Sequence, residues 1–491
     1  MKFLHPLLCL LMAASLRAAE AATPPKKPNI VIILSDDAGY GEFSLDGSKT
    51  IQTPHIDSIA TNGVRFTDGY VSGAVCSPSR AGLLTGRYQE HFGHEFNIPA
   101  GYSETNGLPL TETLLPAVLK PAGYRTIALG KWHLGYAPKF HPMERGFTDY
   151  YGFLQGQRSY FPLAKASRLN QLLRDRTPVT PENFTYMTDE LAKNACDYIV
   201  KSKDTPFFMY LAFNATHAPM DCTKEDLAAA GGNKIKAMTM ALDRGVGTVL
   251  DCIKGNGLAT NTLIVFLNDN GGAAGHNNAP LHGHKGSSWD GGIRVPFAMQ
   301  WPGVIPAGQT FHHPVISLDL FATSISVAGI DKSPGKALDG VNLLPFITGK
   351  DNNRPHQTLY WKHGPAWSVR DGDLKLVGGN ADQTAGQAGL FDLSKDIAES
   401  NDIASSNPAD VKRLHALYDA WAAGILPTPW GRGLKDANDD EDPDITKPAD
   451  TPGPDEPKKT RKEKKAEKEA RKAEKEKQSD RIPANPNQPG S

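Results

Sequence analysis

The 491-residue chain has little cysteine, no excess of charge of either sign, and no apolar run long enough to cross a bilayer. Five cysteines are too few to build a disulfide-framed fold. The 53 basic and 54 acidic side chains nearly cancel, and we expect no nucleic-acid partner. With 39% hydrophobic residues and 47 glycines, the chain is instead typical of one large α/β domain followed by a smaller one.

The longest apolar run, residues 3–16, follows an amino-terminal Met-Lys pair and is too short to span a membrane. It is followed by Ala19-Glu20-Ala21, which fits the small-residue pattern of a signal-peptidase site. We therefore expect residues 1–22 to be a cleavable signal peptide. The protein is then secreted or periplasmic and has no transmembrane segment.

Four cysteines follow the predicted signal peptide: Cys76, Cys196, Cys222 and Cys252. If Cys76 is chemically modified, three thiols remain. Either one pair of them forms a disulfide in an oxidising compartment or all three stay inert thiols, and the sequence does not show which pair would join.

The last part of the chain, residues 431–491, changes sign along its length. Residues 435–457 hold nine acidic and two basic side chains, whereas residues 458–477 hold eleven basic and five acidic ones. Neither part has an apolar stripe, so we expect a charged, proline-rich disordered tail. Such a tail either tethers the protein to an anionic surface or polysaccharide or serves only to keep it soluble.

Two β-branched, apolar stretches, residues 30–34 and 262–267, are typical of strands buried on both faces of a parallel sheet. Each stretch ends in candidate oxygen ligands, which together are Asp36, Asp37, Asp269 and Asn270. Ligands bind at the carboxyl ends of parallel strands, and an all-oxygen set suits Ca²⁺ or Mg²⁺ better than zinc. Either pair alone is more often a cap of the next turn, but two equivalent strand ends favour a metal site.

Two further predicted strands, residues 124–129 and 207–213, also end in polar side chains. Lys131 and His133 follow the first strand, and His217 follows the second. A single histidine or lysine is commonly a satisfied polar group or a surface charge. Their repeated occurrence at strand ends indicates a functional site.

Residues 76–87, Cys-Ser-Pro-Ser-Arg-Ala-Gly-Leu-Leu-Thr-Gly-Arg, predict a short helix that begins at Cys76 and stops at Gly86. The amino terminus of a helix attracts anions, and Arg80 adds a planar donor group suited to a tetrahedral oxyanion. Farther along, Lys285 lies between glycines that leave room for a small anion. A lone buried cysteine is most often structural, but these neighbours favour a chemical role.

The dodecapeptide resembles the signature of the formylglycine-dependent type I sulfatases, and the other polar segments match that family in chain order. They are the paired aspartates, Gly-Lys-Trp-His-Leu-Gly, a histidine before a proline, Asp-Asn-Gly-Gly, and a lysine before Gly-Gly-Ile-Arg-Val-Pro. The resemblance covers roughly residues 28–300, and residues 390–396 resemble the sheet of the family's smaller domain. Asp290 and His282 stand where many members have glutamate and arginine, so we expect different contacts at the pocket rim.

The resemblance implies that a maturation enzyme oxidises Cys76 to formylglycine, whose hydrate attacks sulfur. The implied metal ligands are Asp36, Asp37, Cys76, Asp269 and Asn270, with Ca²⁺ preferred over Mg²⁺. The implied catalytic residues are Cys76, Arg80, Lys131, His133, His217 and Lys285. In this scheme the three cationic side chains neutralise the sulfate, His217 protonates the leaving alcohol, and His133 helps to remove a proton when sulfate departs.

The predicted fold class is α/β and alkaline-phosphatase-like. Residues 28–350 should form the catalytic domain, with a large mixed, mostly parallel sheet flanked by helices. Residues 355–430 should form a small antiparallel sheet with one helix, and the sequence does not indicate an oligomeric state.

The expected substrate is a sulfate monoester, on a sulfated polysaccharide, an oligosaccharide or an aryl group. His94, Arg158 and His363 are candidate substrate contacts, as is Tyr160, with ordinary packing as the equal alternative. Two other functions stay open. One is a phosphonate or phosphate monoester hydrolase of the same superfamily, and the other is an inactive domain that binds sulfated glycans.

Overall fold

The structure is a computed structural model that describes residues 27–331 and 335–431. The predicted signal peptide and, apart from residue 431, the charged tail lie outside the described residues. None of the described helices combines the length and apolarity that a bilayer span requires.

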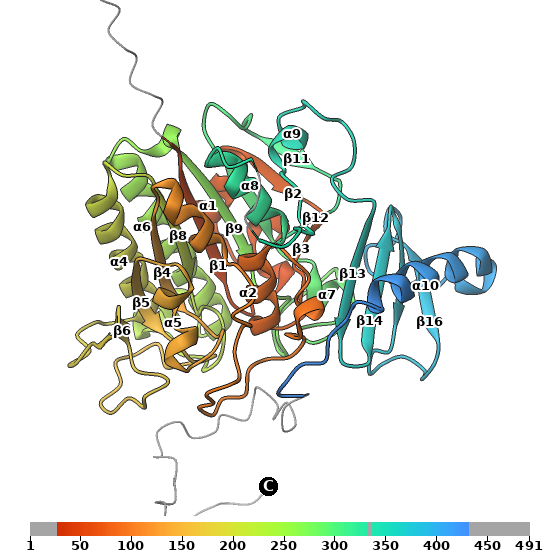
Figure 1. The fold of residues 1–491 in the computed structure, drawn as a ribbon, viewed down its shortest axis with the longest axis horizontal. Coiled ribbons are helices and arrows are strands. Elements are labelled where there is room, and N and C mark those ends of the chain that lie inside the picture. Colours follow the sequence, from red (N-terminus) through yellow and green to blue (C-terminus); the bar gives the residue numbers. More distant parts are fainter. Residues whose placement is uncertain (1–26, 332–334, 432–491) are drawn as a thin grey trace, which may run out of the picture. The chain divides into compact units, whose positions relative to one another are not determined.

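The described residues contain a ten-stranded sheet with the order β11-β2-β10-β9-β1-β8-β4-β5-β6-β7 (Figure 1). Its strands are β1 (Asn29–Ser35), β2 (Val64–Phe66), β4 (Arg125–Lys131), β5 (Asp149–Phe153), β6 (Leu173–Arg174), β7 (Thr177–Pro178), β8 (Phe207–Ala212), β9 (Thr262–Asn268), β10 (Phe297–Gln300) and β11 (Gln309–Phe311). Strands β9, β1, β8, β4 and β5 are parallel to one another, whereas β10, β6 and β7 run antiparallel to their neighbours. The predicted mixed, mostly parallel sheet is confirmed.

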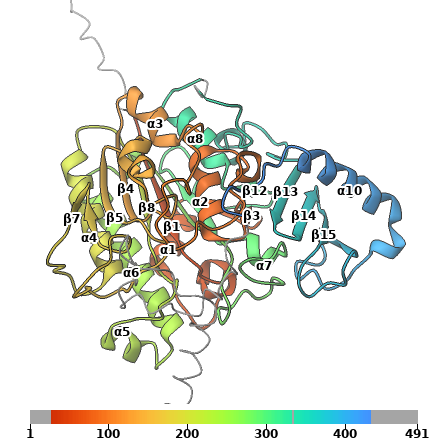
Figure 2. The same ribbon diagram turned by 60° about the horizontal axis from the view of Figure 1, so that its bottom comes forward.

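Both faces of the sheet are covered by helices, as Figures 1 and 2 show. Ile30 and Ile32 of β1 pack in one core with α2, α3 and α8, whereas Val31 and Ile33 pack in a second core with α1, α4 and α6. These helices are α1 (Pro54–Thr61), α2 (Cys76–Thr85), α3 (Leu115–Leu119), α4 (Met187–Ser202), α6 (Lys234–Gly255) and α8 (Asp319–Val327). Burial on both sides explains why polar and apolar residues do not alternate along β1.

A separate antiparallel sheet of four strands and the helix α10 follow, as predicted. The strands are β13 (Thr358–His363), β14 (Ala366–Asp371), β15 (Leu374–Gly378) and β16 (Ala388–Asp392), and α10 spans Pro408–Ala422. Leu414 and Tyr418 of α10 pack on Leu376 and Leu390 of this sheet. The remaining short elements are β3 (Gly69–Tyr70), β12 (Val315–Ile316), α5 (Lys224–Ala229), α7 (Asp290–Ile293) and α9 (Leu344–Ile347).

A buried charge cluster joins the small sheet to the loop that carries Lys285. Lys375 of β15 contacts Asp290 at 2.6 Å and Glu399 at 2.8 Å, and all three side chains are fully buried. Asp290 is the first residue of α7, five positions after Lys285. The same loop is also held next to the cysteine motif, because the Gly286 amide donates a hydrogen bond to the Ala74 carbonyl. The small sheet therefore helps to hold the Lys285 loop in place.

The variant Lys375→Met should be strongly destabilised, because it leaves two buried carboxylates without their shared cation. Removal of one partner from a buried ion pair costs about 3–5 kcal/mol of unfolding free energy. Urea unfolding measures this loss. The matched control is Lys395→Met, which removes a lysine that is 80% exposed and pairs with Asp392 at the surface, and it should leave the unfolding midpoint nearly unchanged. Equal midpoints for both variants would contradict the role given to the buried cluster.

Candidate active site

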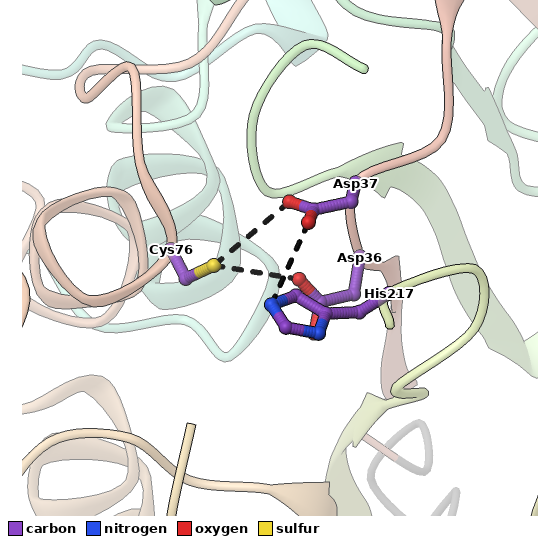
Figure 3. Close-up of side chains that lie close together, drawn as sticks. All are labelled: Asp36, Asp37, Cys76 and His217. Atoms are coloured by element: carbon purple, nitrogen blue, oxygen red, sulfur yellow. Dashed lines mark hydrogen bonds and ion pairs between the residues drawn. The ribbon is translucent and has the colours of Figure 1, made fainter. Parts of the chain in front are cut away.

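Helix α2 begins at Cys76 and is stopped by Gly86, as its sequence predicts. Gly86 adopts φ 66°, a left-handed conformation that glycine tolerates without strain. The whole helix is buried, and its first turn presents Cys76 to the end of β1 (Figure 3). The Cys76 sulfur lies 3.5 Å from Asp36 Oδ1 and 4.0 Å from Asp37 Oδ1.

The two predicted strand ends meet because β1 and β9 are adjacent and parallel. Ser35 pairs with Asn268 at the end of the register, and the Asp269 amide donates to the Ser35 carbonyl at 3.0 Å. This register places Asp36 and Asp269 side by side, both fully buried. Asp37 has φ 62°, a conformation that is rare outside glycine and that commonly occurs at functional sites.

Three cationic side chains surround these carboxylates. Lys131 Nζ lies 2.6 Å from Asp36 Oδ2, and Lys285 Nζ lies 3.0 Å from Asp37 Oδ2. Arg80 contacts Asp269 Oδ2 at 2.7 Å and Asp36 Oδ2 at 3.4 Å. Each predicted cationic side chain therefore reaches the carboxylates from a different segment: α2, the end of β4, and the loop before α7.

The charges of this group shift the pKa of its carboxyls in opposite directions. Burial raises the pKa of Asp36 and Asp37, but the adjacent lysines, together with His217, lower both values below the usual range. Burial and the negative charge of Asp36 raise the pKa of Asp269 to about 7, although Arg80 opposes the rise. The third carboxylate is thus poorly compensated by the protein's own cations.

Several buried oxygens of the site are suited to a cation. Asp269 Oδ1 and Asn270 Oδ1 are buried, and neither has a hydrogen-bond partner among the described residues. Asp36, Asp37, Cys76 and His217 can each direct one ligand atom to a common point, with these atoms within 4.8 Å of one another. This group includes His217, to which the sequence assigned proton transfer, and omits Asp269 and Asn270. Unpaired hard oxygens beside crowded carboxylates fit a divalent cation such as Ca²⁺.

His217 is held in one tautomer. Its Nδ1 donates to the Ala218 carbonyl at 2.7 Å, and its Nε2 lies 3.5 Å from Asp37 Oδ2. Burial lowers the pKa of His217, and Lys131 adds to this effect, while Asp37 opposes it. Nε2 is thus the atom that can gain or lose a proton towards the site.

His133 follows β4, with φ 56°. Burial and then Lys131 lower its pKa well below the usual value, so the ring is neutral. Its Nδ1 has no hydrogen-bond partner among the described residues and is therefore able to accept a proton. The end of β4 before it depends on Gly130, where φ is +89° and a Cβ would lie 1.9 Å from the Ala212 carbonyl oxygen.

Cys76 is not an activated thiol. Burial raises its pKa well above the usual value, and Asp36 and Asp269 add to this effect against the lysines. A thiolate is the nucleophilic form of cysteine, so this environment disfavours thiol chemistry at neutral pH. The position is instead suited to a neutral cysteine side chain that is later modified.

The candidate substrate residues already have protein partners. His94 is fully buried and donates through Nε2 to Ser77 Oγ at 2.6 Å, and burial lowers its pKa to about 3. Arg158 is buried, pairs with Glu182 at 2.7 Å and lies over two phenylalanine rings. His363, at the end of β13, packs edge-on against Phe96. Their contact with substrate stays a prediction.

Two supporting interactions were not foreseen from the sequence. The Tyr160 hydroxyl, fully buried, donates towards the Asn214 and His217 carbonyls, so it holds the His217 loop. Glu42 accepts hydrogen bonds from the Gly39 amide at 2.8 Å and from His276 Nδ1 at 2.9 Å, and so ties the loop after Asp37 to the loop after Asn270. Glu42 has no motif around it, and only its position shortly after the aspartates hints at a role.

Comparison with protein families identifies two matches. The family model described as "Sulfatase" matches residues 28–330. A second model, described as "N-sulphoglucosamine sulphohydrolase, C-terminal", matches residues 284–417. The first match contains all of the predicted catalytic and metal-binding positions.

Individual proteins give the same indication. N-acetylgalactosamine-6-sulfatase of Mus musculus is 33% identical over 390 residues, which cover 74% of this chain and 75% of that protein. The crystal structure of Ps i-CgsB in complex with k-i-k-neocarrahexaose has a TM-score of 0.78 and 36% identity, covering 84% of this chain and 97% of that one. The phosphonate monoester hydrolase of Agrobacterium radiobacter has a TM-score of 0.59, covers 81% of this chain and 95% of that one, and shares 20% identity, which shows a common fold alone.

Proposed function

This chain belongs to the sulfatase family of the alkaline phosphatase superfamily and is a sulfuric ester hydrolase, and we propose that it acts on sulfated carbohydrate through a formylglycine at position 76 and a divalent cation. The observation that carries the proposal is the convergence of three buried cationic side chains and three buried carboxylates around the Cys76 side chain. Arg80, Lys131 and Lys285 would neutralise the sulfate oxygens, which otherwise repel a nucleophile.

The proposed nucleophile is the hydrate of a formylglycine made from Cys76. In support, the buried thiol is held neutral and the helix start directs it at the carboxylates. An aldehyde hydrate has two hydroxyls, so one can attack sulfur while the other later helps to expel sulfate. Maturation requires a formylglycine-generating enzyme as a transient partner.

The proposed cation would be held by Asp36, Asp37, Asp269 and Asn270 together with position 76. When bound, it would acidify the nucleophile and offset the repulsion among the three carboxylates. The unpaired oxygens of Asp269 and Asn270 support this set. Ca²⁺ would be preferred over Mg²⁺ because the ligands come from three separate segments, the ends of β1 and β9 and the start of α2, and Ca²⁺ tolerates irregular coordination better.

The two histidines would divide the proton transfers. His217 Nε2, poised near Asp37, would protonate the leaving alcohol, with Lys285 beside the same carboxylate. His133, neutral and unpartnered at Nδ1 among the described residues, would accept a proton when sulfate leaves. Because burial lowers the pKa of both histidines, His217 would first take up a proton at Nε2, which Asp37 favours, and then act as the acid.

The substrate proposed is a sulfate ester on a galactose-configured sugar. In support, one relative is named N-acetylgalactosamine-6-sulfatase, and the structure of Ps i-CgsB is a complex with k-i-k-neocarrahexaose. A sugar of the galacto configuration carries an axial 4-oxygen, which a hydrogen-bonding pocket distinguishes well from the gluco isomer.

The domain limits and the location stay proposals. We propose a catalytic domain over residues 28–350 and a small domain over residues 355–430. The signal peptide at residues 1–22 would direct export of the protein to a compartment in which it would encounter a sulfated polysaccharide. The tail at residues 431–491 would tether the enzyme to that polymer or keep it soluble.

The modification of Cys76 should be visible by mass. The tryptic peptide of residues 66–80 should be about 18 Da lighter than its cysteine form when the protein comes from a host with a maturation system. The variant Cys76→Ala should lose sulfate release while keeping the wild-type unfolding midpoint, and Cys222→Ala is the matched control that keeps turnover. Wild-type turnover by Cys76→Ala would overturn the formylglycine mechanism, and an intact thiol in inactive native protein would favour the glycan-binding alternative.

Removal of the cation should lower the thermal unfolding midpoint, and added Ca²⁺ should restore it better than Mg²⁺. At a hundredfold excess over the dissociation constant, binding adds about 2.7 kcal/mol of stability. The variant Asp269→Asn should weaken Ca²⁺ binding in titration calorimetry, whereas Asp251→Asn, an exposed position on α6, should not. Identical Ca²⁺ affinities for both variants would contradict the ligand set.

A substrate panel tests the sugar preference. The value of kcat/KM for galactosamine 6-sulfates and sulfated neocarra-oligosaccharides should exceed that for glucosamine 6-sulfate at least tenfold, which is about 1.4 kcal/mol of discrimination. An aryl phosphonate of matched leaving group should react more slowly than the aryl sulfate. Preference for the gluco sugar would refute the galacto assignment, and preference for the phosphonate would support the alternative hydrolase.

A further inference from the structure

Two of the cysteines that the sequence left unassigned lie opposite each other where α4 and α6 pack together. Cys196 belongs to α4 and Cys252 belongs to α6. Each sulfur reaches the backbone of the other helix. Cys196 Sγ lies 3.5 Å from the Thr248 carbonyl, one turn before Cys252, and Cys252 Sγ lies 3.8 Å from the Cys196 carbonyl.

These two contacts bring both thiols to the same place between α4 and α6. Burial, and after it the interaction with the Cys252 side chain, raises the pKa of Cys196 well above its usual value. Both residues are free thiols in the structure and are only partly buried, so an external oxidant can reach them. Cys222 lies elsewhere, in the loop before α5.

We propose that Cys196 and Cys252 form a disulfide that joins α4 to α6. The reaction is an exchange with an external disulfide, such as oxidised glutathione or an exported thiol oxidoreductase. One cysteine thiolate attacks the oxidant's disulfide and forms a mixed disulfide, and the second thiolate displaces the remaining thiol. Two protein thiols are oxidised, one external disulfide is reduced to two thiols, and the two protons end on those thiols.

This cross-link would act on the segment that carries part of the active site. Helix α4 leads into β8 and the His217 loop, and α6 leads into β9 and Asp269. A bond between residues 196 and 252 closes a loop around β8 and the His217 segment, so it restricts the unfolded chain there. The proposal does not require the sulfatase chemistry, because the two thiols lie on the outer helices and not at Cys76.

The test uses the full chain incubated with oxidised glutathione, then denatured and alkylated without reductant. Tryptic peptides 194–201 and 245–254 should be recovered joined, two hydrogens lighter than their sum, and neither cysteine should be alkylated. Reductant should lower the thermal unfolding midpoint of the oxidised protein by about 5 °C. Cys222→Ser is the matched control and should behave as wild type, whereas Cys196→Ser should leave Cys252 free to be alkylated and should not respond to reductant.

Alkylation of both cysteines after oxidation, or recovery of each as a separate glutathione adduct, would overturn the proposal. So would a midpoint that reductant does not change. Sulfate release at low temperature should be equal in the oxidised and reduced forms, so a failure of the sulfatase assignment and a failure of the disulfide are seen in different measurements.

Discussion

The structure depends on the balance of charge at the carboxyl end of β1. Asp36, Asp37 and Asp269 are brought together by the register of two parallel strands, and their burial removes them from the bulk solvent that would screen their charges. Arg80, Lys131 and Lys285 relieve part of the repulsion. Because Asp269 Oδ1 and Asn270 Oδ1 still have no hydrogen-bond partner among the described residues, the site is suited to take up a cation.

This balance of charge requires that the segments carrying the three cationic side chains are held firmly in place. Each cationic side chain comes from a segment with its own support: Arg80 from a buried helix, Lys131 from the end of β4, where Gly130 leaves room for the Ala212 carbonyl, and Lys285 from a loop tied to the small sheet. The histidines depend on similar supports, since Tyr160 holds the His217 loop. Displacement of one anchor would leave a buried carboxylate unpaired, which is costly in a low-dielectric interior.

Much of the fold and of the site follows from the sequence because their signals are local. An apolar run followed at once by aspartates predicts a buried parallel strand with polar groups at its end, and the pairing of β1 with β9 confirms that the two strand ends lie side by side. Tyr160 and His94 could not be assigned in this way, since their burial depends on packing against segments far along the chain. The partnership of Glu42 with His276 joins positions 234 residues apart and has no local pattern at all.

The buried cluster of Asp290, Lys375 and Glu399 has a consequence for how this chain diverges from its relatives. The small sheet cannot be exchanged independently, because its Lys375 neutralises Asp290, which follows the Lys285 loop. A chimera with the small domain of another sulfatase would need a residue in that domain that matches Asp290, whose side chain is shorter than that of glutamate. We therefore expect residues 290, 375 and 399 to change together in evolution, so that the two sheets evolve as one unit.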